Sequence, residues 1–207
     1  MSRYLGSVCK LCRREKEKLF LKGDKCATKC TLETKRGKNL PGGATTMRGK
    51  TTEYAKHLRE KQKARRVYGL NEEQFRHYFA RAERMKGLTG DNLLKLLELR
   101  LDNIVYRLGI VSSRRMARQM VTHGNVLVND KKIDFPSYQM KPGDKVSVVS
   151  FMKENIFVKK SLENPVRCPS WLELNKEDAS GTVKTVPMPD EYSHPIDSQL
   201  IVELYSK

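Results

Sequence analysis

Four of the five cysteines lie within the first thirty residues of the chain, in two close pairs. Two residues separate Cys9 from Cys12, and three separate Cys26 from Cys30. Each short loop presents two thiolates to one face of an ion, so this spacing is typical of a tetrahedral zinc site. Four thiolates leave no open coordination position, so the single zinc ion would be structural. The alternatives are two disulfides, which a cytosolic protein does not keep, or four free thiols.

The second chemical feature is an excess of positive charge. The chain carries 41 Lys and Arg against 24 Asp and Glu, a net charge of +17 at pH 7. Such an excess indicates a polyanionic partner, most often a nucleic acid. It is concentrated in residues 1–66, whereas residues 161–207 are net acidic. Because the basic residues are spread over loops and several helices, binding to a membrane surface is not expected.

Positive charge also surrounds the cysteines. Arg13 and Arg14 lie between the two pairs, so zinc would fold a basic surface that this short segment cannot form alone. Residues 34–50 are rich in glycine and in basic side chains, which is typical of a linker. A helix is predicted over 52–68, ending at Gly69. Its basic residues recur at helical spacing and form one stripe: Lys56, Arg59, Lys63 and Arg66. A surface that faces nucleic acid and an ordinary solvated helix face both fit this stripe.

Two further helices are predicted in the next forty residues. Asn71 caps the first, with Gln74 at the capping-box position. Its aromatic residues share one face and are expected in a core: Phe75, Tyr78 and Phe79. Asp91 is predicted to cap a longer helix that continues to Gly109 with a wide apolar face. Arg100 and Arg107, seven residues apart, would share one edge of that helix.

The segment that follows joins a short helix to strands. Ser112 or Ser113 is predicted to cap the helix, which ends at Gly124 and turns three arginines outward: Arg114, Arg115 and Arg118. A strand at 126–130 would lead into a basic turn that contains Lys131 and Lys132. A second strand is predicted at 145–149, where valines alternate as on a half-buried strand.

These motifs resemble the S-four RNA-binding domain, which is named after small-subunit ribosomal protein number four. The resemblance is carried by RLDN at 100–103, SSRRMARQMV at 112–121, HGNVLVND at 123–130 and PSYQMKPGD at 136–144. Residues 59–79, SWLELN at 170–175 and QLIVELYSK at 199–207 are similar to the ribosomal protein family itself, so the resemblance covers nearly the whole chain. The cysteine segment is similar to the zinc-bearing bacterial version, although its second pair is one residue closer than that family's spacing of four.

Residue patterns and resemblance together predict an α+β fold. Residues 1–50 form a zinc knuckle and basic linker, and residues 51–90 form a helical domain with about 196–207. The tail fits both strand and helix periods, but Asp197 as an N-cap favours a helix. Residues 91–195 form an inserted α/β RNA-binding domain, in which a helix-turn-helix packs on a small, mainly antiparallel sheet.

The resemblance implies a cytoplasmic, non-enzymatic protein of the ribosome. It would recognise a helix junction in the 5′ domain of 16S rRNA, nucleate subunit assembly, and contact ribosomal protein number five to support translational accuracy. Contact with mRNA and repression of the protein's own mRNA are further expectations. The residues predicted to contact RNA are Arg100, Arg107, Arg114, Arg115, Arg118, Lys131, Lys132, Lys56, Arg59, Lys63, Arg66, Arg13 and Arg14.

Two rival functions fit the sequence less well. An RNA-modifying enzyme would need a catalytic constellation, but the chain has no glycine-rich phosphate loop, and its four histidines are scattered in sequence. A zinc-containing DNA-binding regulator would concentrate its charge on one recognition helix and commonly carry a dimerisation heptad. The sequence shows neither a concentration of charge on one helix nor a dimerisation heptad.

Overall fold

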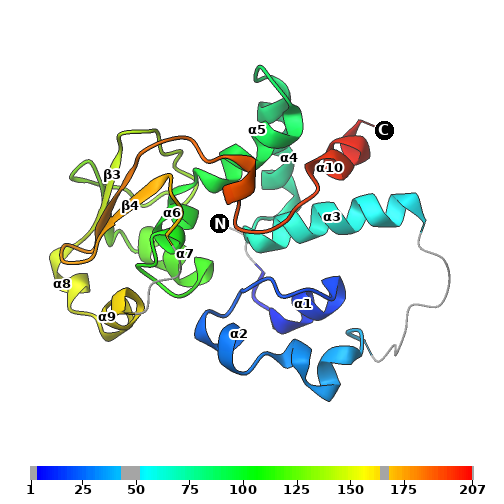
Figure 1. Ribbon diagram of the computed structural model, residues 1–207, viewed down its shortest axis with the longest axis horizontal. Coiled ribbons are helices and arrows are strands. Elements are labelled where there is room, and N and C mark those ends of the chain that lie inside the picture. Colours follow the sequence, from blue (N-terminus) through cyan, green and yellow to red (C-terminus); the bar gives the residue numbers. More distant parts are fainter. Residues whose placement is uncertain (1–3, 43–51, 164–167, 207) are drawn as a thin grey trace. The chain divides into compact units, whose positions relative to one another are not determined.

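The computed structural model describes residues 4–42, 52–163 and 168–206 (Figure 1). The chain divides into two compact units. The first unit contains Met1–Leu93 and His194–Lys207, and the second unit is the continuous segment Leu94–Ser193. The end of the chain therefore returns to the unit in which the chain began.

The first unit is built from helices. Its elements are α1 (Cys9–Glu15), α2 (Asp24–Thr28), the 3-10 turns η1 (Thr31–Glu33) and η2 (Lys35–Lys38), α3 (Glu53–Val67), α4 (Glu72–Glu83) and α10 (Ser198–Tyr205). Thr52 caps α3 by accepting a hydrogen bond from the Ala55 N–H. Asn71 and Gln74 form the predicted capping box at the start of α4. Because these caps satisfy N–H groups that have no partner within the helix, the two predicted starts are confirmed.

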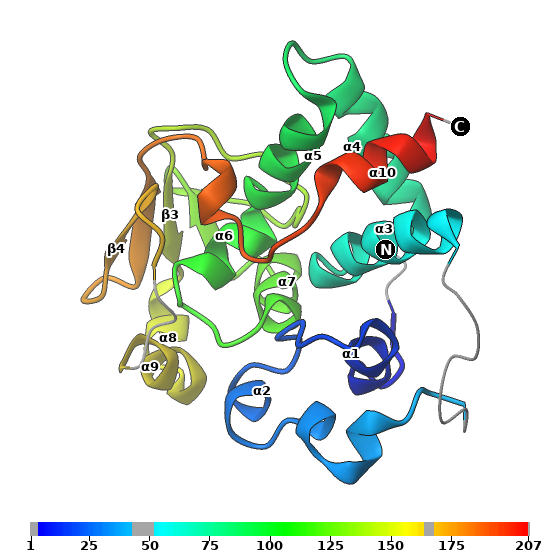
Figure 2. The same cartoon turned by 45° about the vertical axis from the view of Figure 1, so that its right-hand side comes forward.

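The C-terminal tail is a helix that packs along α3 (Figure 2). The Asp197 carboxylate caps α10 by accepting from the Gln199 and Leu200 N–H groups, which confirms the predicted helix. Tyr205 then packs on Phe79, with 4.5 Å between ring centroids. Ile201 is fully buried and anchors the middle of the helix.

Part of the segment predicted as a linker is packed in the first unit. Leu40 is buried, and the Arg13 guanidinium donates hydrogen bonds to the carbonyls of Asn39 and Leu40. The prediction of a linker is therefore wrong for residues 34–42, because Arg13 and the 3-10 turns hold them. The remaining predicted linker residues, 43–50, lie outside the described ranges.

The long helix predicted from Asp91 to Gly109 is in fact two helices, α5 (Thr89–Glu98) and α6 (Leu101–Arg107). The predicted N-cap is also wrong, because Asp91 lies in the first turn of α5. Between them the Leu99 carbonyl accepts from the Met140 N–H, and the Leu101 N–H donates to the Tyr138 carbonyl. Arg100 is extended, with φ −70° and ψ 139°. Tertiary hydrogen bonds to residues 138–140 thus replace helical ones, although the apolar periodicity runs on without a break.

Five strands in the described part of the second unit form one antiparallel sheet. They are β1 (Val126–Val128), β2 (Lys131–Lys132), β3 (Lys145–Val148), β4 (Leu172–Asn175) and β5 (Ser180–Val183), in the order β2-β1-β3-β5-β4. Asn129 and Asp130 both have positive φ, as a tight two-residue turn between β1 and β2 requires. The predicted antiparallel character of the sheet is confirmed.

One face of this sheet packs against α6 and α7 (Arg114–Thr122). Ser113 caps α7 as predicted, by accepting from the Met116 N–H. Gly181 of β5 allows close approach to α6, because a Cβ at this position would lie 2.4 Å from a methyl carbon of Leu108. Two short helices, α8 (Ser150–Lys153) and α9 (Ile156–Glu163), follow β3, and the 3-10 turn η3 (Pro189–Glu191) precedes the return to the first unit.

No helix in the described ranges is both long enough and apolar enough to cross a membrane.

Candidate nucleic-acid interface

The five arginines predicted as central RNA contacts differ in exposure. Arg115 is exposed, whereas Arg100 and Arg114 are only 2% and 8% exposed. The side chains of Arg107 and Arg118 are 13% and 12% exposed. The expectation that α7 turns Arg114, Arg115 and Arg118 outward is therefore wrong for two of the three. Internal partners hold the buried guanidiniums in place.

Asp102 is the first of these partners. The residue is 4% exposed, and its carboxylate receives two hydrogen bonds from Arg100, at 3.0 Å from Nε and 2.8 Å from Nη2. Arg118 of α7 donates to the same carboxylate, at 2.9 Å from Nε. Because Asp102 also lies in the first turn of α6, its charge is favourable to the helix dipole. One carboxylate thus ties α7 to the start of α6.

Glu98 is the second internal partner, and it is fully buried. It accepts hydrogen bonds from Asn103 Nδ2 at 2.6 Å and from the Ser193 hydroxyl at 2.6 Å. Burial acts to raise the pKa of Glu98, but the nearby Arg107 and Arg114 guanidiniums and the Ser193 hydrogen bonds outweigh it and leave the pKa lowered. The ionised carboxylate is therefore the form that the fold favours.

Arg114 completes this buried network. Its Nε donates to Asn103 Oδ1 at 2.8 Å, and its guanidinium lies 4.4 Å from the centroid of the Tyr106 ring. Asn103 also donates to the Glu98 carbonyl at the end of α5. Sequence reasoning did not assign roles to Glu98, Asp102 and Asn103. The signal available in the sequence was two acidic residues near five arginines within residues 98–118.

Three exposed cations remain along α7 and the adjoining β2 strand. Arg115, Lys131 and Lys132 are exposed, and none of them forms an ion pair with another described residue. Gly124, which follows α7, leaves room for the Lys132 side chain, because a Cβ at this glycine would lie 2.1 Å from Lys132 Cε. The three residues, here named the α7 cationic surface, can take anionic ligands without first breaking an internal contact.

The predicted basic stripe of α3 is largely paired within the first unit. Arg59 and Arg66 both contact the Glu15 carboxylate of α1. Burial raises the pKa of Glu15 and outweighs the opposing effect of the two arginines. The stripe is thus largely a seam that holds α1 on α3, not a set of free charges.

Most of the other predicted basic residues of the first unit also have partners within that unit. Lys63 Nζ lies 2.9 Å from a Glu17 carboxylate oxygen and also donates to the Pro195 carbonyl. Lys56 pairs with Glu53 at the exposed start of α3. Arg13, as described above, donates to backbone carbonyls, whereas Arg14 is exposed and has no ion pair within the described ranges.

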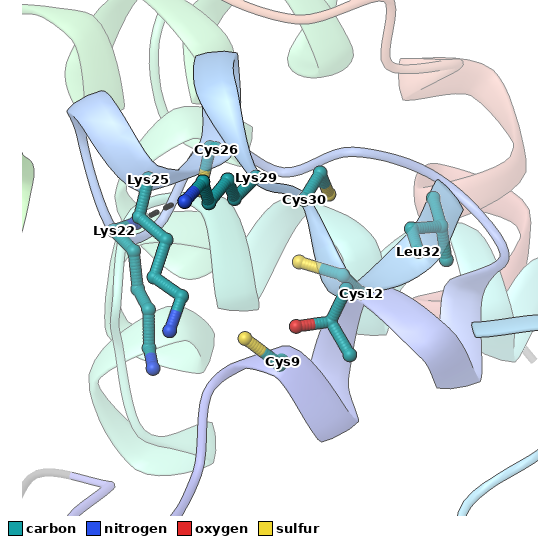
Figure 3. Close-up of a pocket in the computed structure, with 9 residues that line it drawn as sticks. Cys9, Cys12, Lys22, Lys25, Cys26, Lys29, Cys30 and Leu32 are labelled. Carbon is teal, nitrogen blue, oxygen red and sulfur yellow. Dashed lines mark hydrogen bonds between the residues drawn. The ribbon is translucent and has the colours of Figure 1, made fainter. Parts of the chain in front are cut away.

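All four N-terminal cysteines line one small pocket (Figure 3). The pocket encloses about 20 Å³, enough for a single small ion. Burial raises the pKa of Cys12, and negative charge on the other three cysteines raises it further, as expected for thiols that are close together. The donor set fits zinc in number and chemistry. However, no three Cys, His, Asp or Glu side chains of the described residues are placed closely enough to hold a metal as they stand.

Comparisons with known proteins agree with this architecture. The family described as Ribosomal protein S4/S9 N-terminal domain matches residues 3–98, and the S4 domain family matches residues 99–146. The chain is 62% identical to the small ribosomal subunit protein uS4 of Endomicrobium trichonymphae over the full length of both chains. It is 52% identical to uS4 of Trichlorobacter lovleyi and 52% identical to uS4A of Clostridium acetobutylicum, again over both full lengths.

Proposed function

The chain belongs to the uS4 family of small ribosomal subunit proteins, and from that premise we propose that its second unit binds small-subunit rRNA through the α7 cationic surface. It is a structural constituent of the small ribosomal subunit, and its relatives carry the name of a ribosomal protein rather than of an enzyme. The observation that carries the proposal is the exposure of Arg115 on α7, which buried ion pairs fix to α6, and of Lys131 and Lys132 on β2.

The proposed mode of binding is recognition of shape. Base edges of duplex RNA lie in a deep, narrow groove, so a protein at a helix junction reads phosphates, 2′-hydroxyls and the shape of the junction. The Asp102 and Glu98 networks support this mode, because they fix α7, and with it the position of Arg115, before RNA arrives. The target that the family resemblance supports is a helix junction in the 5′ domain of 16S rRNA.

The predicted direct contact of Arg100, Arg107, Arg114 and Arg118 with RNA stays a prediction. In this proposal the four arginines act mainly as positioning residues, since each has partners inside the second unit. Arg14 adds an exposed cation in the first unit.

Further roles are proposed on the family resemblance. They are nucleation of subunit assembly, contact with ribosomal protein number five in support of translational accuracy, contact with mRNA, and repression of the protein's own mRNA. Each requires that the chain first bind the small subunit or its rRNA.

Co-sedimentation tests the proposal directly. The labelled full-length chain is expected to migrate with small ribosomal subunits reconstituted from rRNA and the remaining proteins, and to remain at the top of the gradient when rRNA is omitted. Recovery at the top of the gradient in both cases would contradict the proposal. An unrelated basic protein of similar size and charge is the control for nonspecific attraction to rRNA.

We also propose that the four cysteines of the first unit hold one structural zinc ion. Elemental analysis of the purified chain is expected to give about one zinc per chain, and the double variant Cys12→Ser, Cys26→Ser is expected to lose it. Because metal binding supplies folding free energy, a chelator should also lower the melting temperature of the wild-type protein.

The control for the zinc experiment is Cys168→Ser, which changes the one cysteine outside the pocket and should keep the metal. Wild-type protein without zinc, or a double variant that retains it, would overturn the zinc proposal.

A further inference from the structure

A cavity of about 350 Å³ lies in the second unit between α7 and the two short helices that follow β3. Figure 2 shows α8 and α9 at one end of the sheet, on the side of α7. The cavity walls are Met116 and Met120 from α7, Met152 from α8 and the Phe157 ring from α9. Its volume falls within the range of about 300–1,000 Å³ that is usual for small-molecule sites.

The apolar wall is held in place from behind. Val158, the neighbour of Phe157, is fully buried in the core of the second unit. The Asn155 side chain accepts from the Phe157 N–H at 2.9 Å and so fixes the first turn of α9. Phe157 itself remains 63% exposed. The backbone that carries this large aromatic ring is thus fixed, while the ring itself is open to solvent at the edge of the cavity.

Polar groups complete the lining. Gln119, His123 and Asn125 border the cavity, and no side-chain hydrogen bond joins any of them to another described residue. Two amides and an imidazole offer both donors and acceptors. An aromatic face combined with a few accessible donors and acceptors is the chemistry by which proteins hold a nucleobase outside its helix.

Charge around the cavity favours a nucleic acid over a peptide. The described residues that line it include no acidic side chain. Arg115, which belongs to the α7 cationic surface, lies one helical turn before Gln119 on α7, so the two side chains share a face. The stem of Lys132 lies against Gly124, immediately after His123 at the other end of the helix. A ligand in the cavity would therefore have cations at both ends of α7 for its phosphates.

We propose that this cavity receives one unpaired nucleobase of small-subunit rRNA, extruded from its helix and stacked on Phe157. Gln119, His123 and Asn125 hydrogen-bond to the edge of the base, and Arg115 contacts the adjoining phosphate. The inference rests on the proposed rRNA binding and adds a single-nucleotide site to it. Shape recognition alone reads no base, so this site would contribute sequence preference at one position.

The test compares two phenylalanines of nearly equal exposure. Phe157→Ala removes the stacking ring, whereas Phe151→Ala removes a 66% exposed ring on α8 that does not line the cavity. Affinity for purified 16S rRNA is measured by filter binding. Phe157→Ala is expected to weaken binding by about 5- to 150-fold, the cost of losing one base stack, and Phe151→Ala by less than about twofold. Gln119→Ala provides a second variant and should also weaken binding.

Photo-crosslinking supplies a readout that does not depend on affinity. With 4-thiouridine-substituted 16S rRNA, the wild-type chain is expected to crosslink through the peptide that contains Phe157 or through α7. Wild-type binding with no such crosslink and no loss on Phe157→Ala would overturn the nucleobase site and leave the proposed function intact.

Two other outcomes would each lead to a different conclusion. If the wild-type chain does not bind 16S rRNA, the proposed function fails and takes the nucleobase site with it. If Phe157→Ala keeps its affinity for rRNA but no longer joins reconstituted subunits, the cavity takes a protein segment, and the nucleobase proposal is wrong.

Discussion

Asp102→Ala is expected to lower the free energy of unfolding of the second unit by about 3–5 kcal/mol. Arg100 is 2% exposed and Arg118 only slightly exposed, and both donate to the Asp102 carboxylate. Removing the carboxylate leaves two guanidiniums close together in a poorly solvated place. Loss of one partner from a buried ion pair costs far more than the pair itself contributes to stability, because the remaining charge keeps its desolvation penalty.

Urea denaturation followed by tryptophan fluorescence measures this effect with a probe that lies in the second unit. The chain has a single tryptophan, Trp171, which is 1% exposed in the core of that unit. Asp134→Ala is the matched control, since Asp134 is exposed and makes no ion pair with another described residue. The control should change stability by no more than about 0.5 kcal/mol. Equal denaturation midpoints for Asp102→Ala and wild type would show that the buried network is not needed for stability.

Local signals made much of the fold predictable. Thr52, Asn71, Ser113 and Asp197 are good N-cap residues placed directly before apolar periodic segments, and each caps a helix in the structure. An N-cap acts within three residues of itself, so its signal is complete in the local sequence. The antiparallel strands β1 and β3 were found for the same reason, because alternating valines need only a nearby turn.

The break between α5 and α6 depends on residues forty positions away and was not predictable in that way. Leu97, Leu101 and Ile104 continue one apolar face through the break, so periodicity indicates a single helix. The chain instead bonds to Tyr138 and Met140, and Arg100 turns inward to Asp102. Tertiary hydrogen bonds override local propensity here, and no pattern within residues 89–109 records them.

Dependence on distant residues also explains why the sequence does not show which charged side chains are paired. Arginine at helical spacing predicts an exposed helix face, because arginine is seldom buried. The exception requires an acidic partner, and for Arg59 and Arg66 that partner is Glu15, more than forty residues earlier in the chain. Net charge therefore identified the class of partner, whereas the structure decides which cations remain available to it.

The triple variant Arg115→Glu, Lys131→Glu, Lys132→Glu is expected to weaken binding to 16S rRNA on the order of 100- to 1,000-fold at roughly 0.1 M salt. Each lost phosphate contact removes about one unit from the slope of log K against log salt concentration, so the slope should become shallower by about three. All three side chains are exposed and without ion pairs among the described residues, so the melting temperature should stay close to that of wild type.

Any reversal of positive charge lowers the net charge of the protein and so weakens its attraction to RNA. The control variant must therefore carry the same change in net charge. Lys141→Glu, Lys145→Glu, Lys176→Glu reverses three exposed lysines of the same unit that lie outside the α7 cationic surface. If long-range attraction dominates, both triple variants lose affinity equally, and the α7 cationic surface has no special role. If the rigid helix pair positions a specific contact, the first variant loses far more affinity than the control. Steering by net charge acts on any polyanion, whereas a positioned contact acts only where a phosphate meets it.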